Sequence, residues 1–252
     1  MVTFSVSSFK GGTAKTSTSL HLGACFAKFH KKKTLLIDCD AQANLTTGLG
    51  LDPDEHDSMA QVLQEEKSIE SVIQKTSIPN LHLIPADTWL ERVEVTGKLA
   101  SDRYSHEKLK KILEPLDYDY IVIDTPPSLC WLTESALIAS HHTLICATPE
   151  FYSVKGLFRL SQFVNSIAER HPIGILGVLL SFWNPRGKSN KAFIEVIEQA
   201  FPNKLLKTKV RRDIAVSEAS VMGKPLFETN PESRAAEDYQ TLGQELIKRM
   251  NS

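Results

Sequence analysis

The chain has 252 residues, and its 29 lysines and arginines nearly balance its 30 aspartates and glutamates, so the formal net charge is −1. This balance excludes a bulk polycation, and any contact with nucleic acid has to come from a local basic face. Hydrophobic residues make up 42% of the chain and charged residues 23%, which excludes a disordered protein. Because no Pro-, Gly- or Ser-rich stretch divides the sequence, we expect a single domain over residues 1–252.

Cysteine usage and hydropathy favour a cytoplasmic protein. The four cysteines, Cys25, Cys39, Cys130 and Cys146, are too few and too widely spaced for a disulfide scaffold or a Cys-x-x-Cys metal pair. The longest apolar run, Ile173 to Trp183, is about half the ~20 residues that a bilayer-spanning helix needs. No basic region precedes an apolar stretch at the N-terminus, so we expect no secretory signal and no membrane span.

The first elements predict a strand, a helix and a second strand. Residues Val2 to Ser7 alternate apolar and polar and run into the glycine pair of Lys10-Gly11-Gly12, which indicates a strand and a tight loop. Apolar spacing predicts a helix from Lys15 to about Phe29, and Thr34 to Ile37 is a short apolar strand that ends on Asp38. The parallel strands of such a βαβ unit place their carboxyl ends at one edge of the sheet.

Strands and helices continue to alternate along the chain. This alternation predicts an α/β fold, with a doubly wound, mostly parallel sheet and helices on both faces. Helix starts of the capping-box type occur at Ser58-x-x-Gln61 and Thr88-x-x-Glu91. The further strands are predicted at Leu81–Ile84, Tyr120–Ile123, Thr143–Ala147 and Ile175–Leu180, and two long helices at Ser153–Ala168 and Ser233–Met250.

The segment between the first strand and the first helix has the context of a phosphate-binding loop. Its glycines let backbone N–H groups face phosphate oxygens, Lys15 can reach the β- and γ-phosphates, and Thr16 can ligate Mg²⁺. Two positions depart from the pattern G-x-x-x-x-G-K-[ST]: Phe9 stands at the first glycine, and Ala14 stands before the lysine. On the loop alone, the alternative is a glycine turn followed by a helix with a surface lysine.

Acidic residues follow two of the predicted strands. Asp38 and Asp40 come just after the second strand, and Asp124 ends the apolar run Tyr120–Ile123, the Walker B arrangement in which a carboxylate contacts Mg²⁺. Open α/β sheets bind ligands at this edge. Any one of these acids could simply cap a helix. Three acids and two lysines at the loop and the two strand ends together favour a nucleotide site.

Three segments resemble motifs of the ParA/MinD ATPases. Lys10-Gly11-Gly12-Thr13-Ala14-Lys15-Thr16 is similar to their deviant Walker A loop, K-G-G-x-x-K-[ST]. Asp38-Cys39-Asp40-Ala41-Gln42-Ala43-Asn44 resembles D-x-D-P-Q-x-N with Ala41 at the proline, and Asp124-Thr125-Pro126-Pro127 is typical of ParA proteins. The resemblance covers nearly the whole chain, least clearly between about Asp52 and Leu116, and implies a P-loop NTPase that uses ATP and Mg²⁺.

The resemblance also implies roles for single residues. Lys10 would reach the partner's nucleotide in an ATP-sandwich homodimer, and Asp40 would position the attacking water. Catalysis would consist of positioning and of charge neutralisation by Lys10, Lys15 and Mg²⁺. The implied magnesium residues are Thr16, Asp38 and Asp124. The implied nucleotide contacts are Lys10, Gly11, Gly12, Thr13, Ala14, Lys15, Thr16, Ser17 and, from the loop near the adenine base, Asn184.

The segment from Asn184 to Arg212 is strongly basic, with eight lysines and arginines against two glutamates, and 8 − 2 gives +6. Such a run is either a solvated face or a surface for the phosphates of duplex DNA. Lys207–Ala219, Gly223-Lys224-Pro225 and Ser233–Tyr239 resemble the ParA region that binds DNA without sequence preference. The resemblance implies DNA contacts at Arg186, Lys188, Lys209, Arg211 (usually proline in the family) and Arg212.

The resemblance as a whole implies a ParA-type partition ATPase. ATP would drive dimerisation, the dimer would bind nonspecific double-stranded DNA, and a ParB-type centromere-binding partner would stimulate hydrolysis during chromosome or plasmid partition. The protein would then be cytoplasmic and nucleoid-associated. Because the phosphate loop begins nine residues into the chain, we expect no N-terminal helix-turn-helix domain.

Three other functions remain open. A MinD-like, membrane-associated cell-division regulator would need a basic amphipathic tail; Leu242, Leu246 and Met250 share a helical face, but we expect that face to be core. A metal-cluster role lacks a cysteine partner near Cys130. An ATP-binding module without hydrolysis would follow if Phe9, Ala14 and Ala41 abolish turnover.

Overall fold

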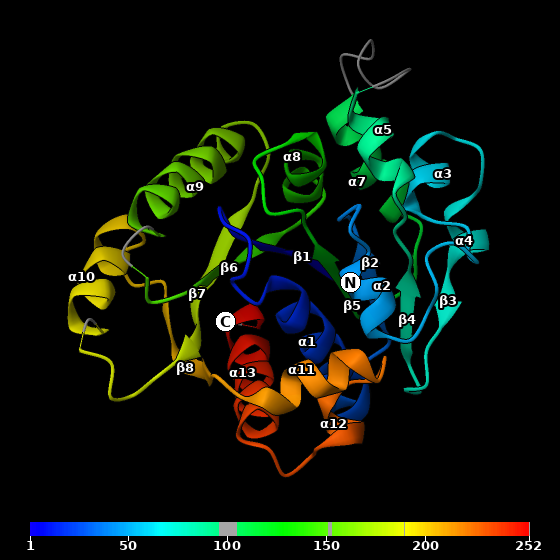
Figure 1. Ribbon diagram of the computed structural model, residues 1–252. Coiled ribbons are helices and arrows are strands. Elements are labelled where there is room, and N and C mark those ends of the chain that lie inside the picture. The colour runs from blue at the N-terminus through cyan, green and yellow to red at the C-terminus, as the bar shows by residue number, and fades with distance from the viewer. Residues whose placement is uncertain (96–104, 151–152, 189, 252) are drawn as a thin grey trace.

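One eight-stranded sheet organises the molecule (Figure 1). The computed structural model describes residues 1–95, 105–150, 153–188 and 190–251. The strand order is β3-β4-β2-β5-β1-β6-β7-β8, and β3 pairs antiparallel with β4 whereas the other neighbours are parallel. The strands are β1 Val2–Ser7, β2 Thr34–Asp38, β3 Gln74–Lys75, β4 Leu81–Ile84, β5 Tyr120–Asp124, β6 His142–Ala147, β7 Gly174–Trp183 and β8 Leu205–Arg211.

Helices cover both faces of this sheet, which confirms the predicted doubly wound α/β fold. They are α1 Lys15–His30, α2 Asn44–Gly48, α3 Met59–Leu63, α4 Ile69–Val72, α5 Trp89–Val95, the 3₁₀ helix η1 Ser105–Glu107, α7 Lys108–Leu113, α8 Trp131–Ile138, α9 Ser153–Ala168, α10 Asn190–Ala200, α11 Ile214–Val221, α12 Leu226–Thr229 and α13 Arg234–Met250.

The sheet separates two layers of core. Successive strand residues face opposite sides, so Leu36 of β2 packs in the layer under α1 and α13, whereas Leu35 and Ile37 pack under α3, α7 and α8. In α13, Leu242 and Leu246 are fully buried in the first layer. The apolar face of this last helix is therefore core, as predicted. Among the helices that the structure describes, none combines the length and apolarity required to cross a bilayer.

The structure differs from the sequence predictions at two places, the start of α5 and strand β8. The Ser58 capping box is present, with Ser58 Oγ accepting from the Ala60 amide and Gln61 Oε1 accepting from the Ser58 amide. At α5, however, it is the Asp87 carboxylate that accepts from the Trp89 amide, at 2.9 Å. Strand β8 lies outside the strands predicted from the sequence, because its alternation is carried by lysines, which are common on the edge strands of sheets.

The sheet has its topological switch point at β1. This strand lies between β5 and β6, so the chain leaves β1 toward β2 on one side and later returns to β6 on the other. Crevices for ligands form at the carboxyl ends of strands at such a point. The loop after β1, Asp38 at the end of β2 and Asp124 at the end of β5 meet there, since β2 and β5 pair Asp38 with Asp124 in register.

Candidate functional site

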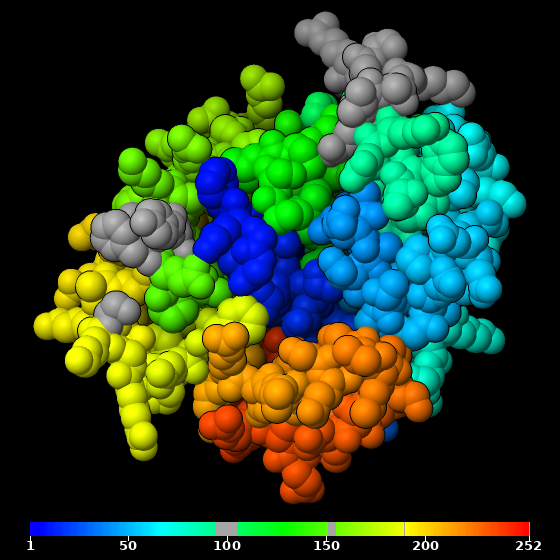
Figure 2. All heavy atoms as spheres, viewed as in Figure 1, coloured from blue at the N-terminus to red at the C-terminus, as the bar shows by residue number. Residues whose placement is uncertain are grey.

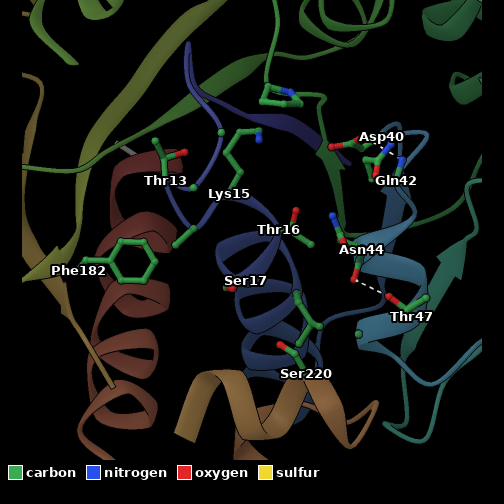
Figure 3. Close-up of a pocket in the computed structure, with 16 residues that line it drawn as sticks. Thr13, Lys15, Thr16, Ser17, Asp40, Gln42, Asn44, Thr47, Phe182 and Ser220 are labelled. Atoms are coloured by element: carbon green, nitrogen blue, oxygen red, sulfur yellow. Dashed lines mark hydrogen bonds between the residues drawn. The ribbon is translucent and has the colours of Figure 1, made fainter. Parts of the chain in front are cut away.

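The loop after β1 wraps the N-terminus of α1 and forms one wall of a cleft of about 450 Å³ (Figure 3). Gly12 and Ala14 adopt left-handed backbone conformations, with φ of 72° and 62°. Glycine takes this conformation without strain but alanine does not, so Ala14 holds a strained turn directly before Lys15. Seven predicted residues of this loop and the start of α1 line the cleft: Gly11, Gly12, Thr13, Ala14, Lys15, Thr16 and Ser17.

The other walls come from segments far away in sequence. In Figure 3, Phe182 from β7 and Asp40 lie on opposite sides of the cleft, with Lys15 and Thr16 between them. In the space-filling view, the blue N-terminal residues are surrounded by segments from later in the chain (Figure 2). Sequence reasoning missed Phe182 and Ser220 as cleft residues, because neither belongs to a local phosphate-site pattern. The remaining lining residues are Leu20, Gln42, Asn44, Thr47, Gly48 and Pro127.

Asp124 is held next to the phosphate loop by two hydroxyls of α1. Thr16 Oγ1 donates to Asp124 Oδ2 at 2.7 Å, and Ser19 Oγ donates to Oδ1 at 2.8 Å. The carboxylate is fully buried, and this burial raises its pKa to about 6 against the opposing effects of Lys15 and the two hydroxyls. A hydroxyl beside a desolvated carboxylate is an oxygen donor set that suits Mg²⁺. Ser19 could have been found from its helical spacing to Thr16.

Asp38 lies beneath the cleft and organises the loop that carries Asp40. Its oxygens accept from the Asp40 amide at 3.1 Å and from the amide and hydroxyl of Thr46 at 3.0 and 2.8 Å. Burial, followed by the nearby charge of Asp124, raises the pKa of Asp38 to about 7. Asp38 is fully buried, whereas Asp40 lines the cleft and accepts from the Gln42 amide at 3.1 Å. The structure thus brings Asp40 to the cleft and places Asp38 as its support.

Lys10 lies outside the cleft that Lys15, the other phosphate-loop lysine, lines. Its ammonium group forms an ion pair with Glu150, and both side chains are about half exposed. Lys15, by contrast, is 7% exposed and lines the cleft. The two predicted lysines therefore differ: one belongs to the cleft within the chain and the other stands at the molecular surface.

The end of β7 presents Phe182 to the cleft, whereas Asn184 in the loop after it does not line the cleft. Phe182 has a left-handed backbone, with φ of 52°, and its side chain is 41% exposed. Asn184 is exposed, its side-chain oxygen accepts from the Arg186 amide, and its carbonyl accepts from Asn190 Nδ2 at 2.9 Å. Its side chain thus closes the turn that follows the cleft.

The predicted DNA-contacting residues fall into two groups. Arg186, Lys188 and Arg212 are exposed, and Lys209 is half-buried with its ammonium 5.2 Å from the centre of the Trp183 ring. Arg211 is different, because its guanidinium forms a two-pronged ion pair with the buried carboxylate of Asp238, with hydrogen bonds of 2.7 to 3.1 Å, and a further bond to Glu237. These carboxylates raise the pKa of Arg211 above its ordinary value.

The fold and the site together define a P-loop nucleotide-binding protein: a strand, a glycine loop and a helix N-terminus face two strand-end carboxylates at the switch point of a parallel sheet. Residues 1–175 match the AAA domain family. The chain is 66% identical to a ParA family protein of Chlamydia trachomatis over 98% of both chains, and 37% identical to the sporulation initiation inhibitor protein Soj of Bacillus subtilis over 94% of both. The chain belongs to the ParA family of P-loop ATPases.

A solved structure extends the comparison to MinD. The septum site-determining protein MinD from Pyrococcus horikoshii, crystallised with Mg-ADP, superposes with a TM-score of 0.81 at 25% identity, covering 98% of this chain and 96% of that one. Among the residues that the structure describes, no group of three His, Cys, Asp or Glu side chains is placed to hold a metal.

Proposed function

We propose that this protein is a Mg²⁺-dependent ATPase that dimerises on ATP, binds double-stranded DNA without sequence preference and drives chromosome or plasmid partition with a ParB-type partner. The observation that carries the proposal is that Lys15, Thr16 and Asp40 line one cleft and that Thr16 donates a hydrogen bond to the buried Asp124. Membership of the ParA family and the likeness to Mg-ADP-bound MinD support ATP and Mg²⁺ as its ligands.

The residues of the chain divide the chemistry among themselves. The loop amides from Gly11 to Thr16 and the α1 N-terminus bind the phosphates, and Lys15 neutralises charge on the transferring phosphoryl group. Thr16 and Asp124 would hold Mg²⁺, which would offset negative charge on the phosphate oxygens. Asp40, fixed from below by Asp38, orients the attacking water. Positioning of this kind needs no covalent nucleophile.

The proposed dimer gives Lys10 a role in binding nucleotide. Lys10 is next to the glycine pair but projects to the surface, where Glu150 holds it. In the proposed dimer, Lys10 leaves Glu150 and contacts the nucleotide of the other subunit. Because ATP has more negative charge than ADP, the γ-phosphate favours this exchange, which makes the dimer specific for the triphosphate.

DNA binding rests on basic residues of the C-terminal third that are exposed or half-buried. Arg186, Lys188, Lys209 and Arg212 can neutralise backbone phosphates, and nothing in their arrangement requires base-specific contacts. The charge of Arg211 is already neutralised by Asp238 and Glu237. We therefore propose that Arg211 stabilises the structure of this surface. Nonspecific DNA binding in turn gives a nucleoid-associated protein.

Binding to a random-sequence duplex across a salt series, with ATP, ADP or no nucleotide, tests this proposal. We expect ATP-dependent binding that weakens with salt, and we expect Arg212→Ala to weaken it uniformly and to reduce the salt slope by about 1. Lys15→Ala is the nucleotide-site control and should remove the ATP dependence. Equal binding in all three nucleotide states, or none, would contradict the nucleotide-gated DNA clamp.

A MinD-like membrane function is the second candidate, favoured by the structural likeness to MinD. The burial of Leu242 and Leu246 in the core weighs against the last helix as a membrane anchor. Co-sedimentation with anionic liposomes in the same three nucleotide states separates the two candidates. ATP-dependent sedimentation without DNA binding would favour the membrane function.

A further inference from the structure

Helix α9 packs against the phosphate loop at Phe9, the residue that replaces the first glycine of the P-loop pattern. The Phe9 ring lies so close over Gly156 that a Cβ on residue 156 would be 2.4 Å from Phe9 Cδ1 and 3.0 Å from Cγ. Carbon atoms pack at about 3.5–4.0 Å. Only glycine at position 156 therefore leaves room for the ring, which seats Phe9 in a slot on the helix.

Two further contacts join the same arm of the loop to the same element. The guanidinium carbon of Arg159, one turn further along α9, is 5.6 Å from the centre of the Phe9 ring, within the range of a cation–π contact. The next residue, Lys10, forms its ion pair with Glu150, which lies just before α9. The arm that carries Lys10 is thus attached to one structural unit at neighbouring points.

A small, partly open pocket beside this arm leaves space for it to move. It has a volume of about 130 Å³ and is lined by Phe9, Lys10, Thr13, Cys146, Ala147, Gly156 and Leu157. Because this space is not filled by protein atoms, a ring displaced from its slot can be accommodated there. The seat on Gly156 is then what holds the arm in register.

We propose that Phe9 is a positioning residue whose ring, seated on Gly156, fixes the backbone of Lys10 relative to α9 and so keeps Lys10 at Glu150 until nucleotide draws it away. The effect on turnover rests on the proposed function of Lys10, whereas the mechanical coupling of Phe9, Gly156 and Lys10 does not. The substitution of the usual glycine by phenylalanine is, on this view, a functional feature of the loop.

The coupling is tested first without nucleotide, by the rate at which acetic anhydride acylates Lys10, followed by peptide mass spectrometry. Gly156→Ala unseats the ring and Phe9→Ala removes it, so each should speed acylation of Lys10, up to the roughly fivefold that the loss of an exposed ion pair allows. Glu150→Gln sets the upper limit. The double variant Phe9→Ala/Gly156→Ala should react no faster than either single variant, since both changes break one contact.

Gly243→Ala is the matched control. Gly243 is also a buried helix glycine, and a Cβ there would lie 2.6 Å from Cys25 Sγ, away from Phe9. It should lower the melting temperature as Gly156→Ala does but leave Lys10 acylation unchanged. Faster acylation in Gly243→Ala, unchanged acylation in Gly156→Ala, or multiplying effects in the double variant would each overturn the proposal.

Turnover provides the second measurement. We expect Gly156→Ala to lower ATP turnover between about tenfold and about a hundredfold, because a displaced Lys10 backbone misplaces the ammonium group at the nucleotide as well as at Glu150. KM for ATP should stay within about threefold because Lys15 and the loop amides are untouched. An inactive wild-type protein would refute the proposed function yet leave the acylation result standing. An active wild-type protein with full turnover in Gly156→Ala would refute the role of Phe9 alone.

Discussion

The nucleotide cleft and the basic segment Asn184–Arg212 hold their charged groups in opposite ways. At the cleft, Asp38 and Asp124 are fully buried and each accepts hydrogen bonds from named neighbours. In the basic segment, Arg186 and Lys188 stand exposed on the surface. A buried charge is stabilised only if its few hydrogen-bond partners keep one geometry, whereas exposed charges each add a similar amount to the binding of a polyanion. We therefore expect all-or-none effects of substitutions at the cleft and graded effects in the basic segment.

Arg211 and His21 do not fit this division. Arg211 belongs to the basic segment by sequence but is held by Asp238 as tightly as a cleft residue. His21 belongs to α1 but links it to the C-terminal third, because its ring stacks on Tyr239 at 4.6 Å and accepts from the Leu226 amide. These two residues are where the comparison between the regions can be tested most sharply.

The largest effect is expected for Lys15→Ala. Removing a buried positive charge that faces the transferring phosphoryl group should lower ATP turnover by about a hundredfold or more. Steady-state phosphate release measures it, and Lys188→Ala, in the exposed group, is the control that should leave turnover of the free protein unchanged. Similar losses in both variants would erase the contrast between the two regions.

The second effect separates neighbouring arginines. Arg211→Ala breaks the ion pair with Asp238. Among the residues that the structure describes, this leaves the buried carboxylate with the backbone amide of residue 211 as its donor, so we expect the free energy of unfolding to fall by about 2 kcal/mol. Arg212→Ala removes an exposed side chain and should change it by less than about 0.5 kcal/mol. Urea denaturation of both variants measures the difference. Equal stabilities would mean that the Arg211 network contributes nothing to the fold.

The third effect is the pH dependence that His21 contributes. Burial, only partly opposed by the hydrogen bond to the Ser17 carbonyl, lowers its pKa to about 4. The unfolded chain, with a histidine pKa near 6.5, then binds more protons between these values, so this contribution to stability is lost as pH falls from 6.5 toward 4. From pH 6.5 to 5 the loss should be about 1.5 kcal/mol.

The measurement is a difference curve of unfolding free energy between the wild-type protein and His21→Gln over that pH range. Because glutamine does not titrate, the wild-type protein should lose stability relative to the variant as pH falls. His30→Gln, at the solvent end of the same helix, is the control. A His21 curve parallel to that of the control would show that the pH effect arises elsewhere.

The same division explains what the sequence could predict. The predicted strands around Phe4, Leu36 and Val122 and the helix after Lys15 are confirmed, because burial imposes a period of 2 or 3.6 on apolar residues. The phosphate loop and Asp40 were predictable since a local pattern sets them. Phe182 was not, because it reaches the cleft through the pairing of β7 with β6, a contact between distant segments.

The smallest effect concerns the strain in the phosphate loop itself. Ala14 sits at φ 62° directly before α1, a conformation that costs a non-glycine residue about 1–2 kcal/mol. Ala14→Gly removes this strain but increases the freedom of the unfolded chain by about 0.5–1 kcal/mol, so a net gain in stability of about 0.5–1 kcal/mol is expected. Thermal unfolding measures it, with Ala24→Gly in the middle of α1 as the opposite control, because glycine there should destabilise. A loss of stability in Ala14→Gly would mean that contacts of the Ala14 methyl group outweigh the backbone strain, and that the departure from glycine is part of how this loop is built.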